Sequence, residues 1–256
     1  SVSTRGCDIR DAACQRLIYR ATACVNDVAG GKIPDIRTIS LDEFEAELQA
    51  ESGPAESAAS GWSTAFALLG LLPTGQGVQD AAISVAVNGI AAYFDDVTKD
   101  VTVIDRGDNQ DPENELFTLS HEFVHAQRDQ FDDLGAFRDE FATSTDSFMA
   151  VKGLVEGEAM VVSLAVVAAD RGRSASDIDW TGFGEAILDS SLMAIEASDV
   201  PFLTAIQSLP YGLGALQLGA LWGAEGRDVI DQLYGDPDLS LLAFAPDTAA
   251  KRTQPL

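Results

Sequence analysis

The sequence predicts an α+β fold that is predominantly helical. The chain has 256 residues, enough for a domain with a sizeable core. Short β-rich runs occur only in its first half, and the part after residue 130 is patterned as helices. We therefore expect one domain over residues 1–256 with two lobes. The N-terminal lobe, at about 30–130, should hold a small sheet, and the C-terminal lobe, at about 131–240, should be helical.

The first elements alternate between helix and strand. A helix over 8–28 should end at Gly30-Gly31, and the β-branched run 36–39 should be a strand. Ser40 and Glu43 then form a capping box that opens a helix to about residue 49. Residues 51–63 indicate a loop or weak helix, followed by helices over 62–72 and 78–87.

A β-hairpin is expected next. The runs 90–94 and 101–104 are short and β-rich, and the polar segment 95–100 between them is typical of a turn. Asp111-Pro112 then begins a helix that should reach about Gln130, because aspartate caps helices and proline suits their first turn. Further helices are predicted over 134–147, 151–170, 183–197, 200–208, 211–223 and 227–234, with an irregular tail.

The composition argues against some classes of partner. Aspartate and glutamate number 41 against 16 lysines and arginines, for a formal charge of −25. Such a surface repels phosphate backbones, so we expect no nucleic-acid partner; it suits high solubility or a basic peptide partner. The longest apolar run, 159–169, is too short to cross a bilayer, so no membrane span is expected.

The cysteines leave the compartment open. Cys7, Cys14 and Cys24 lie close together in sequence but match no common zinc pattern. One disulfide with one leftover thiol would favour an extracytoplasmic site, and three buried thiols would not. The chain begins without a signal segment, so it is either intracellular or has lost a targeting segment, an alternative that we slightly favour.

The run His121-Glu122-Phe123-Val124-His125 is the strongest chemical motif, and it contains both histidines of the chain. Residues four apart share one helix face, so both imidazoles can bind one Zn²⁺ ion. Glu122 is rotated away from the ion and can act as general base on a zinc-bound water. The alternative is a solvated helix face with two incidental histidines.

A catalytic zinc site needs a third protein ligand. With no third histidine, a carboxylate is the remaining choice, and Glu156 lies in an otherwise apolar helix where an unpaired charge would be costly. Gly153 and Gly157 would let this helix approach the motif helix closely. Glu156 and Glu158 can also be explained as exposed residues near a helix start.

The pair of motifs, HEFVH and the downstream Glu156-Gly157-Glu158-Ala159, resembles the zinc-binding pattern of gluzincin metallopeptidases. The wider runs HEFVHAQRDQ and LVEGEA resemble a group of prokaryotic metallopeptidase-like proteins over about residues 36–218. This resemblance implies a zincin-like core, one catalytic zinc on His121, His125 and Glu156, and hydrolysis of peptides or proteins, with an endopeptidase expected. The alternative is a catalytically silent zincin-like binding or scaffold protein.

The resemblance also suggests outer residues of the site. The aspartate that follows the third ligand in gluzincins is replaced by Met160, so Asp129 and Glu158 are candidates for orienting the histidines. Tyr211, in a Pro-Tyr-x-x-Gly segment, is a candidate donor to the oxyanion, or a core aromatic. By analogy, Val101 and Val103 would form the upper edge of the cleft and pair with an extended substrate.

Overall fold

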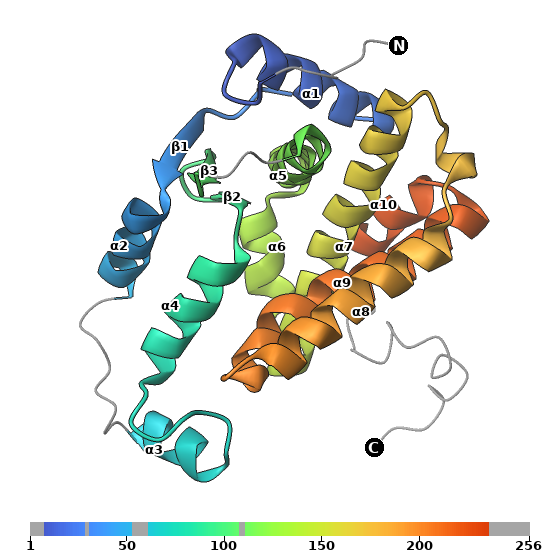
Figure 1. Cartoon of the computed structure of the whole chain (residues 1–256). Helices are drawn as coiled ribbons and strands as arrows, with labels where there is room; N and C mark the ends of the chain where they lie inside the picture. The colour runs from blue at the N-terminus through green and yellow to red at the C-terminus, as the bar shows by residue number, and fades with distance from the viewer. Residues whose placement is uncertain (1–7, 29–30, 53–60, 108–110, 236–256) are drawn as a thin grey trace, which may run out of the picture.

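A small sheet packed among helices is the framework of the structure, a computed structural model that describes residues 8–28, 31–52, 61–107 and 111–235 (Figure 1). The described residues are mostly helical and the sheet has three strands, which confirms the predicted α+β class. The irregular tail that the sequence predicts lies outside the described residues, as do 53–60 of the predicted loop.

The sheet has the order β1-β3-β2. Its strands are β1 (Ile36–Ser40), β2 (Ala92–Phe94) and β3 (Val101–Asp105). Strands β2 and β3 pair antiparallel, which confirms the predicted hairpin, and β1 pairs with β3 in parallel. Because β3 is thus paired along both of its sides, it is the central strand, and β1 and β2 are the two edge strands.

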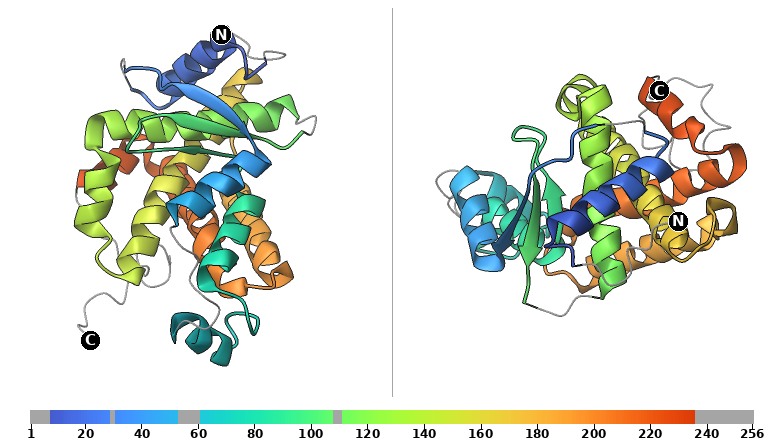
Figure 2. Two further views of the ribbon diagram at one scale, coloured as in Figure 1. Left: turned by 90° about the vertical axis from the view of Figure 1, so that its left-hand side faces the viewer. Right: turned by 90° about the horizontal axis from the view of Figure 1, so that it is seen from above.

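Helices cover both faces of the sheet. Figure 2 shows α2 (Leu41–Glu51) on one side and α5 (Pro112–Asp132) on the other. Ile39 and Ile104 pack with Phe44 of α2, whereas Val101 joins the main core with α5 and α1 (Ala12–Val25). The alternation follows from the two-residue period of a strand. Helices α3 (Gly61–Leu68) and α4 (Val78–Gly89) lie between α2 and β2 in the chain.

Local capping explains where two of the helices begin. Ser40 and Glu43 form the predicted capping box at α2. Asp111 accepts a hydrogen bond from the Glu113 backbone N–H, and Pro112 occupies the first turn of α5. These contacts satisfy N–H groups that have no partner within the helix, so the start of the motif helix is set locally.

The helices after α5 differ from the prediction at two places. They are α6 (Leu134–Phe141), α7 (Thr145–Asp170), the 3₁₀ turn Ala175–Asp177, α8 (Trp180–Ala197), α9 (Pro201–Glu225) and α10 (Asp228–Gly235). The break between α6 and α7 falls before Thr145, since Ser144 and Ser147 form a capping box there. The predicted break near residue 209 is absent, and α9 continues through Pro210.

Side chains from neighbouring helices support α9 around this proline. A proline lacks the N–H that a helix interior needs, which weakens the preceding turn. Lys152 of α7 donates to the Gln207 carbonyl oxygen at 3.5 Å, and Ser191 of α8 donates to the Ser208 carbonyl oxygen at 3.0 Å. Two carbonyl oxygens of the turn before Pro210 thus gain hydrogen-bond donors from two other helices.

Glycines set the crossing of α7 and α9. A Cβ atom on Gly214 would lie 2.1 Å from the Gly153 carbonyl oxygen, and one on Gly157 would lie 2.6 Å from the Gly214 backbone. The expectation that Gly153 and Gly157 bring α7 close to the motif helix is therefore wrong, because their contact is with α9. This close crossing brings Tyr211 of α9 beside Glu156 of α7.

The cysteines follow the alternative of one disulfide with one leftover thiol. Cys14 is disulfide-bonded, whereas Cys24 is a free and exposed thiol. In the described ranges, no helix has the length and apolar character needed to cross a membrane.

Candidate metal centre

Two adjacent helices bring the motif residues together. His121 and His125 lie one turn apart on α5, and Glu156 lies on α7, which packs against it. Their ligand atoms all lie within 4.8 Å of one another, and among the described residues this is the one such group of three. Both histidines are buried, at 7% and 8% exposed.

The distances from Glu156 to the two histidines match those between ligands of a tetrahedral ion. Two ligand atoms each about 2.05 Å from a tetrahedral metal lie about 3.3 Å apart. The Glu156 Oε2 atom is 3.1 Å from His121 Nε2 and 3.3 Å from His125 Nε2. Two nitrogens and one carboxylate oxygen are also a donor set that zinc accepts. The group can therefore hold a metal ion.

Glu156 is held in its charged form. Burial by itself favours a neutral carboxyl, but hydrogen bonds with His121 and His125 outweigh it and place the pKa of Glu156 well below its ordinary value. A carboxylate that stays ionised is ready to bind a cation.

Glu122 lies beside this group with a different electrostatic environment. It is 5% exposed. Burial raises its pKa to about 7, helped by the charge of Glu156 and opposed by His121 and by a hydrogen bond from the Phe94 backbone N–H. Its carboxyl can therefore take up and release a proton near neutral pH, as a general base must.

Tyr211 closes one side of the group. Its ring stacks on the His121 imidazole with centroids 5.8 Å apart, and its hydroxyl is hydrogen-bonded to Glu156. Burial and the charges of Glu156 and Glu122 raise the Tyr211 pKa well above its ordinary value, so the hydroxyl keeps its proton and can donate it in a hydrogen bond.

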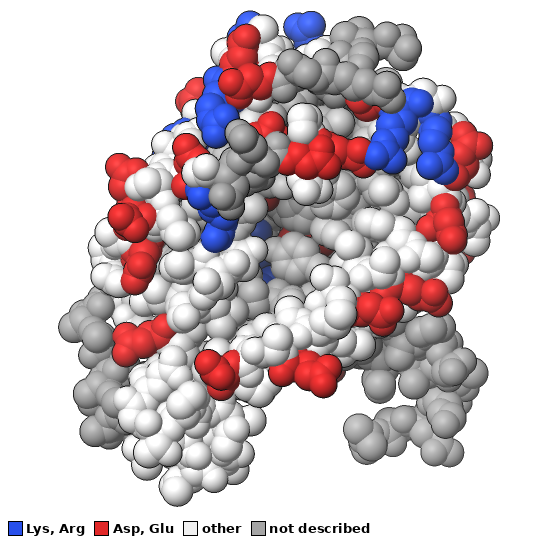
Figure 3. Space-filling model, viewed as in Figure 1, with Lys and Arg blue, Asp and Glu red and all other residues white. Residues whose placement is uncertain are grey.

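Two cavities adjoin the group. One of about 370 Å³ is lined by His121, Glu122 and Tyr211, and by apolar residues of α8 and of the segment before β2. Another of about 220 Å³ is lined by Glu156, Lys152 and Arg138 with apolar walls. The face of the molecule in Figure 3 is hollowed at its centre, with acidic and basic side chains visible inside. Solvent-sized molecules can thus approach the ligands from two sides.

Asp129 and Glu158 have partners other than the histidines. Asp129 is buried and accepts hydrogen bonds from Lys99 Nζ at 2.8 Å and from the Leu134 backbone N–H at 3.2 Å. It therefore ties α5 to the hairpin turn and to the start of α6. Neither contact orients an imidazole.

Glu158 belongs to a buried ion-pair cluster. Its carboxylate accepts hydrogen bonds from Arg128 of α5 and, at 2.9 Å, from Arg227. Arg227 also donates to Asn26, which caps α1, and both arginines contact Asp231 of α10. The cluster joins α1, α5, α7 and α10 behind the metal group, so Glu158 has a structural role.

Val101 and Val103 cannot receive a substrate strand. They lie on β3, whose two edges are occupied by β1 and β2. The prediction that this strand forms the edge of the cleft is wrong, because the parallel pairing with β1 covers it. Of the two edge strands, β2 is the one beside the metal group: the Phe94 N–H reaches Glu122, and Ala92 lines the cavity beside His121.

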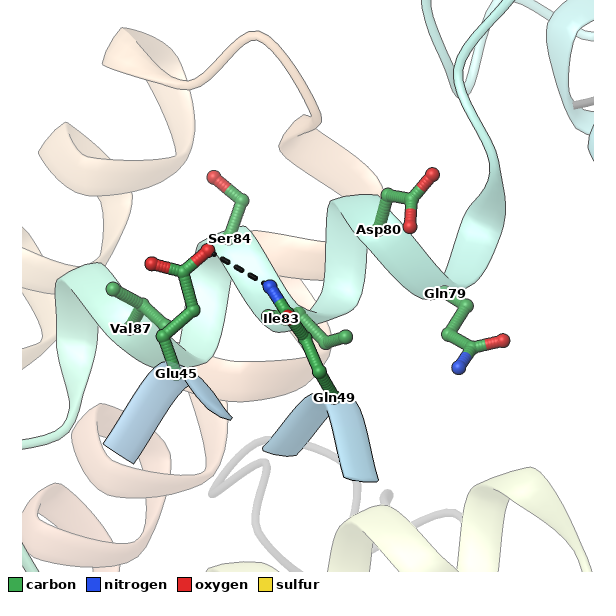
Figure 4. A pocket seen from close by; sticks show the side chains of 7 residues that line it. All are labelled: Glu45, Gln49, Gln79, Asp80, Ile83, Ser84 and Val87. Carbon is green, nitrogen blue, oxygen red and sulfur yellow. Dashed lines mark hydrogen bonds between the residues drawn. The ribbon is translucent and has the colours of Figure 1, made fainter. Parts of the chain in front are cut away.

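Another hollow, of about 540 Å³, lies between α2 and α4 (Figure 4). Its polar lining includes Glu45, whose carboxylate accepts a hydrogen bond from Gln49 at 3.1 Å. It lacks the histidines and the paired ligand geometry of the metal group. The chemistry of the described residues is therefore concentrated at α5 and α7.

Lys152 and Arg138 are site residues that the sequence motifs do not identify. Lys152 precedes Glu156 by one helical turn, and this basic residue in an apolar run is the signal that could have found it. Arg138, on α6, has no comparable signal, since its position depends on how α6 packs.

In comparisons with protein-family models, curated proteins and solved structures, we found no significant match to this chain. The geometry of the site is therefore the basis for any functional conclusion.

Proposed function

We propose that this protein is a zinc-dependent peptidase of the gluzincin type. The observation that carries the proposal is the grouping of His121, His125 and Glu156, with Glu156 Oε2 3.1 Å and 3.3 Å from the two imidazole nitrogens and with Glu122 directly beside it. Zinc bound there would supply a Lewis acid that polarises water and the scissile carbonyl.

The side chains around the group have separate roles in this proposal. Glu122 takes a proton from the attacking water and delivers it to the leaving amine, a task suited to a pKa of about 7. The protonated hydroxyl of Tyr211 donates to the developing oxyanion. The free edge of β2 offers backbone groups to an extended peptide.

A catalytically silent metal-binding or scaffold protein is the competing proposal. It would need the three ligands but not a buried carboxyl whose pKa matches general-base catalysis. Glu122, together with two cavities that reach the ligands, favours the peptidase.

The test compares the wild-type chain with Glu122→Gln after zinc loading. We expect both proteins to hold about one zinc per chain and only the wild type to cleave a broad peptide library. Zinc content is measured by elemental analysis and cleavage by mass spectrometry.

Glu45→Gln is the matched control, because Glu45 is an exposed residue of α2 away from the metal group. Equal cleavage by wild type and Glu122→Gln would contradict the assigned base. Zinc-loaded wild type that cleaves nothing in the library would favour the scaffold proposal instead.

A further inference from the structure

We infer that the cavity lined by Arg138, Lys152 and Glu156 binds a carboxylate group of the substrate. This inference rests on the proposed metal site and names the chemistry that lies next to it. The cavity has a volume of about 220 Å³, and Phe148, Val151 and Val155 form its apolar walls. An apolar stem that ends in an acidic group fits such a lining.

The two basic residues retain hydrogen-bonding capacity. In the described part of the chain, the hydrogen bonds of Lys152 Nζ go to Gln207 alone, at 3.3 Å and 3.5 Å. Arg138 forms an ion pair with Asp96 at 2.9 Å. Since an ammonium has three N–H donors and a guanidinium five, both can also donate to a ligand.

The charge balance of the loaded site favours an anion. Glu156 is the metal-ligand carboxylate that lines this cavity. When a divalent cation binds to Glu156, the negative charge near Lys152 is more than neutralised, and Lys152 and Arg138 then face an excess of positive charge. This is a local reversal in a protein of charge −25, and it makes the cavity selective for an acidic group.

The cavity also lies directly beside the metal group, where the proposed reaction would take place. Glu156 belongs both to its lining and to the metal group. A substrate held by its carboxylate would therefore place a nearby peptide bond at the metal. The carboxylate has two sources, the C-terminus of a peptide or an internal acidic side chain.

The experiment measures binding, so that it does not depend on turnover. Zinc-loaded Glu122→Gln is titrated with acetylated alanine hexapeptides: an amidated neutral reference, the same peptide with a free C-terminal carboxylate, and amidated peptides with one glutamate at successive positions. We expect one of the two acidic series to bind about tenfold more tightly than the reference.

Substitutions of Lys152 and Arg138 test whether the tighter binding of the acidic peptides comes from this cavity. Lys152→Gln and Arg138→Gln, each made in the Glu122→Gln protein, should lose most of the gain, and Lys152→Arg should keep it. Arg173→Gln removes the same charge from the exposed turn that follows α7 and should change nothing. Zinc content and thermal unfolding show whether each variant is folded.

The outcomes separate this inference from the proposed function. Equal binding of neutral and acidic peptides, no binding of any acidic peptide, or a gain that persists when Arg138 and Lys152 are both replaced would overturn the carboxylate site. Cleavage of the neutral reference by the wild type would then leave the peptidase intact. Acid-selective binding that depends on Lys152, without any cleavage, would support the cavity and count against the peptidase.

Discussion

The ring of Tyr211 stacks on the imidazole of His121, with an angle of 17° between their planes. The two residues come from α9 and α5, 90 positions apart in sequence. The stack places the hydroxyl at Glu156, so one aromatic residue contacts two of the three candidate metal ligands.

The first prediction separates the ring of Tyr211 from its hydroxyl. Tyr211→Phe should keep the stack and the bound zinc but lower kcat for peptide hydrolysis by about 100-fold, because one oxyanion donor is lost. Steady-state kinetics and elemental analysis measure the two effects. Tyr93→Phe, which removes a hydroxyl bonded to Arg37 at 3.0 Å, is the control. An unchanged kcat in Tyr211→Phe would leave the tyrosine with a packing role only.

A second prediction compares two glutamates on the same helix. Glu156→Gln should lower zinc affinity by more than about 100-fold, since a direct ligand matters more than an outer partner. Glu158→Gln should keep zinc affinity but lower the free energy of unfolding by about 3 kcal/mol, because two buried arginines lose their carboxylate. Competition with a zinc chelator and urea denaturation distinguish them. The assignment of roles fails if the two variants behave alike.

The third prediction concerns the crossing of α7 and α9. Gly214→Ala should lower the free energy of unfolding by about 3 kcal/mol, since the new Cβ would lie 2.1 Å from a backbone oxygen that cannot easily move. Gly61→Ala, where a Cβ meets no atom within 4 Å, should change the stability by less than about 1 kcal/mol. Chemical denaturation of both variants tests the packing directly; similar stabilities would mean that the helices can separate at no cost.

A fourth prediction follows from Glu122 in the metal-free protein. Its pKa is raised by burial to about 7 in the folded chain, against 4.5 for an ordinary glutamate. Between these values the folded state holds a proton that the unfolded state has lost. The stabilisation is complete below pH 4.5 and is lost as pH rises to about 7, by roughly 3 kcal/mol.

Denaturation in the presence of a chelator at several pH values measures this effect. The difference in unfolding free energy between wild type and Glu122→Gln should change in favour of the variant as pH rises. The same comparison with Glu45→Gln should show no such trend. A difference that is independent of pH would mean that Glu122 is charged in the folded protein throughout this range.

The local signals in the sequence predicted the parts of the fold that depend on neighbouring residues. The Ser40 capping box, the Asp111 cap and the hairpin lie where expected. The grouping of His121, His125 and Glu156 could also be predicted from the sequence. Two of these residues lie one helix turn apart, and the third is an acidic residue in an apolar run.

Features that depend on contacts between residues far apart in the sequence could not be predicted in the same way. The parallel pairing of β1 with β3 joins strands 65 positions apart and makes Val101 and Val103 central. Glu158 pairs with Arg227, 69 positions away. Neither partner has a periodicity that would reveal it, since each contact follows from how whole helices and strands pack.

The buried Arg128–Glu158 pair has a consequence for how a metal would enter and leave. It joins α5 and α7 close to the metal group, three residues after His125 on one helix and two after Glu156 on the other. In the folded chain the candidate ligands His121, His125 and Glu156 are therefore already held with their ligand atoms within 4.8 Å of one another. Under the proposed zinc binding, an ion would enter and leave this group without unfolding of the chain, and its capture would cost little conformational entropy.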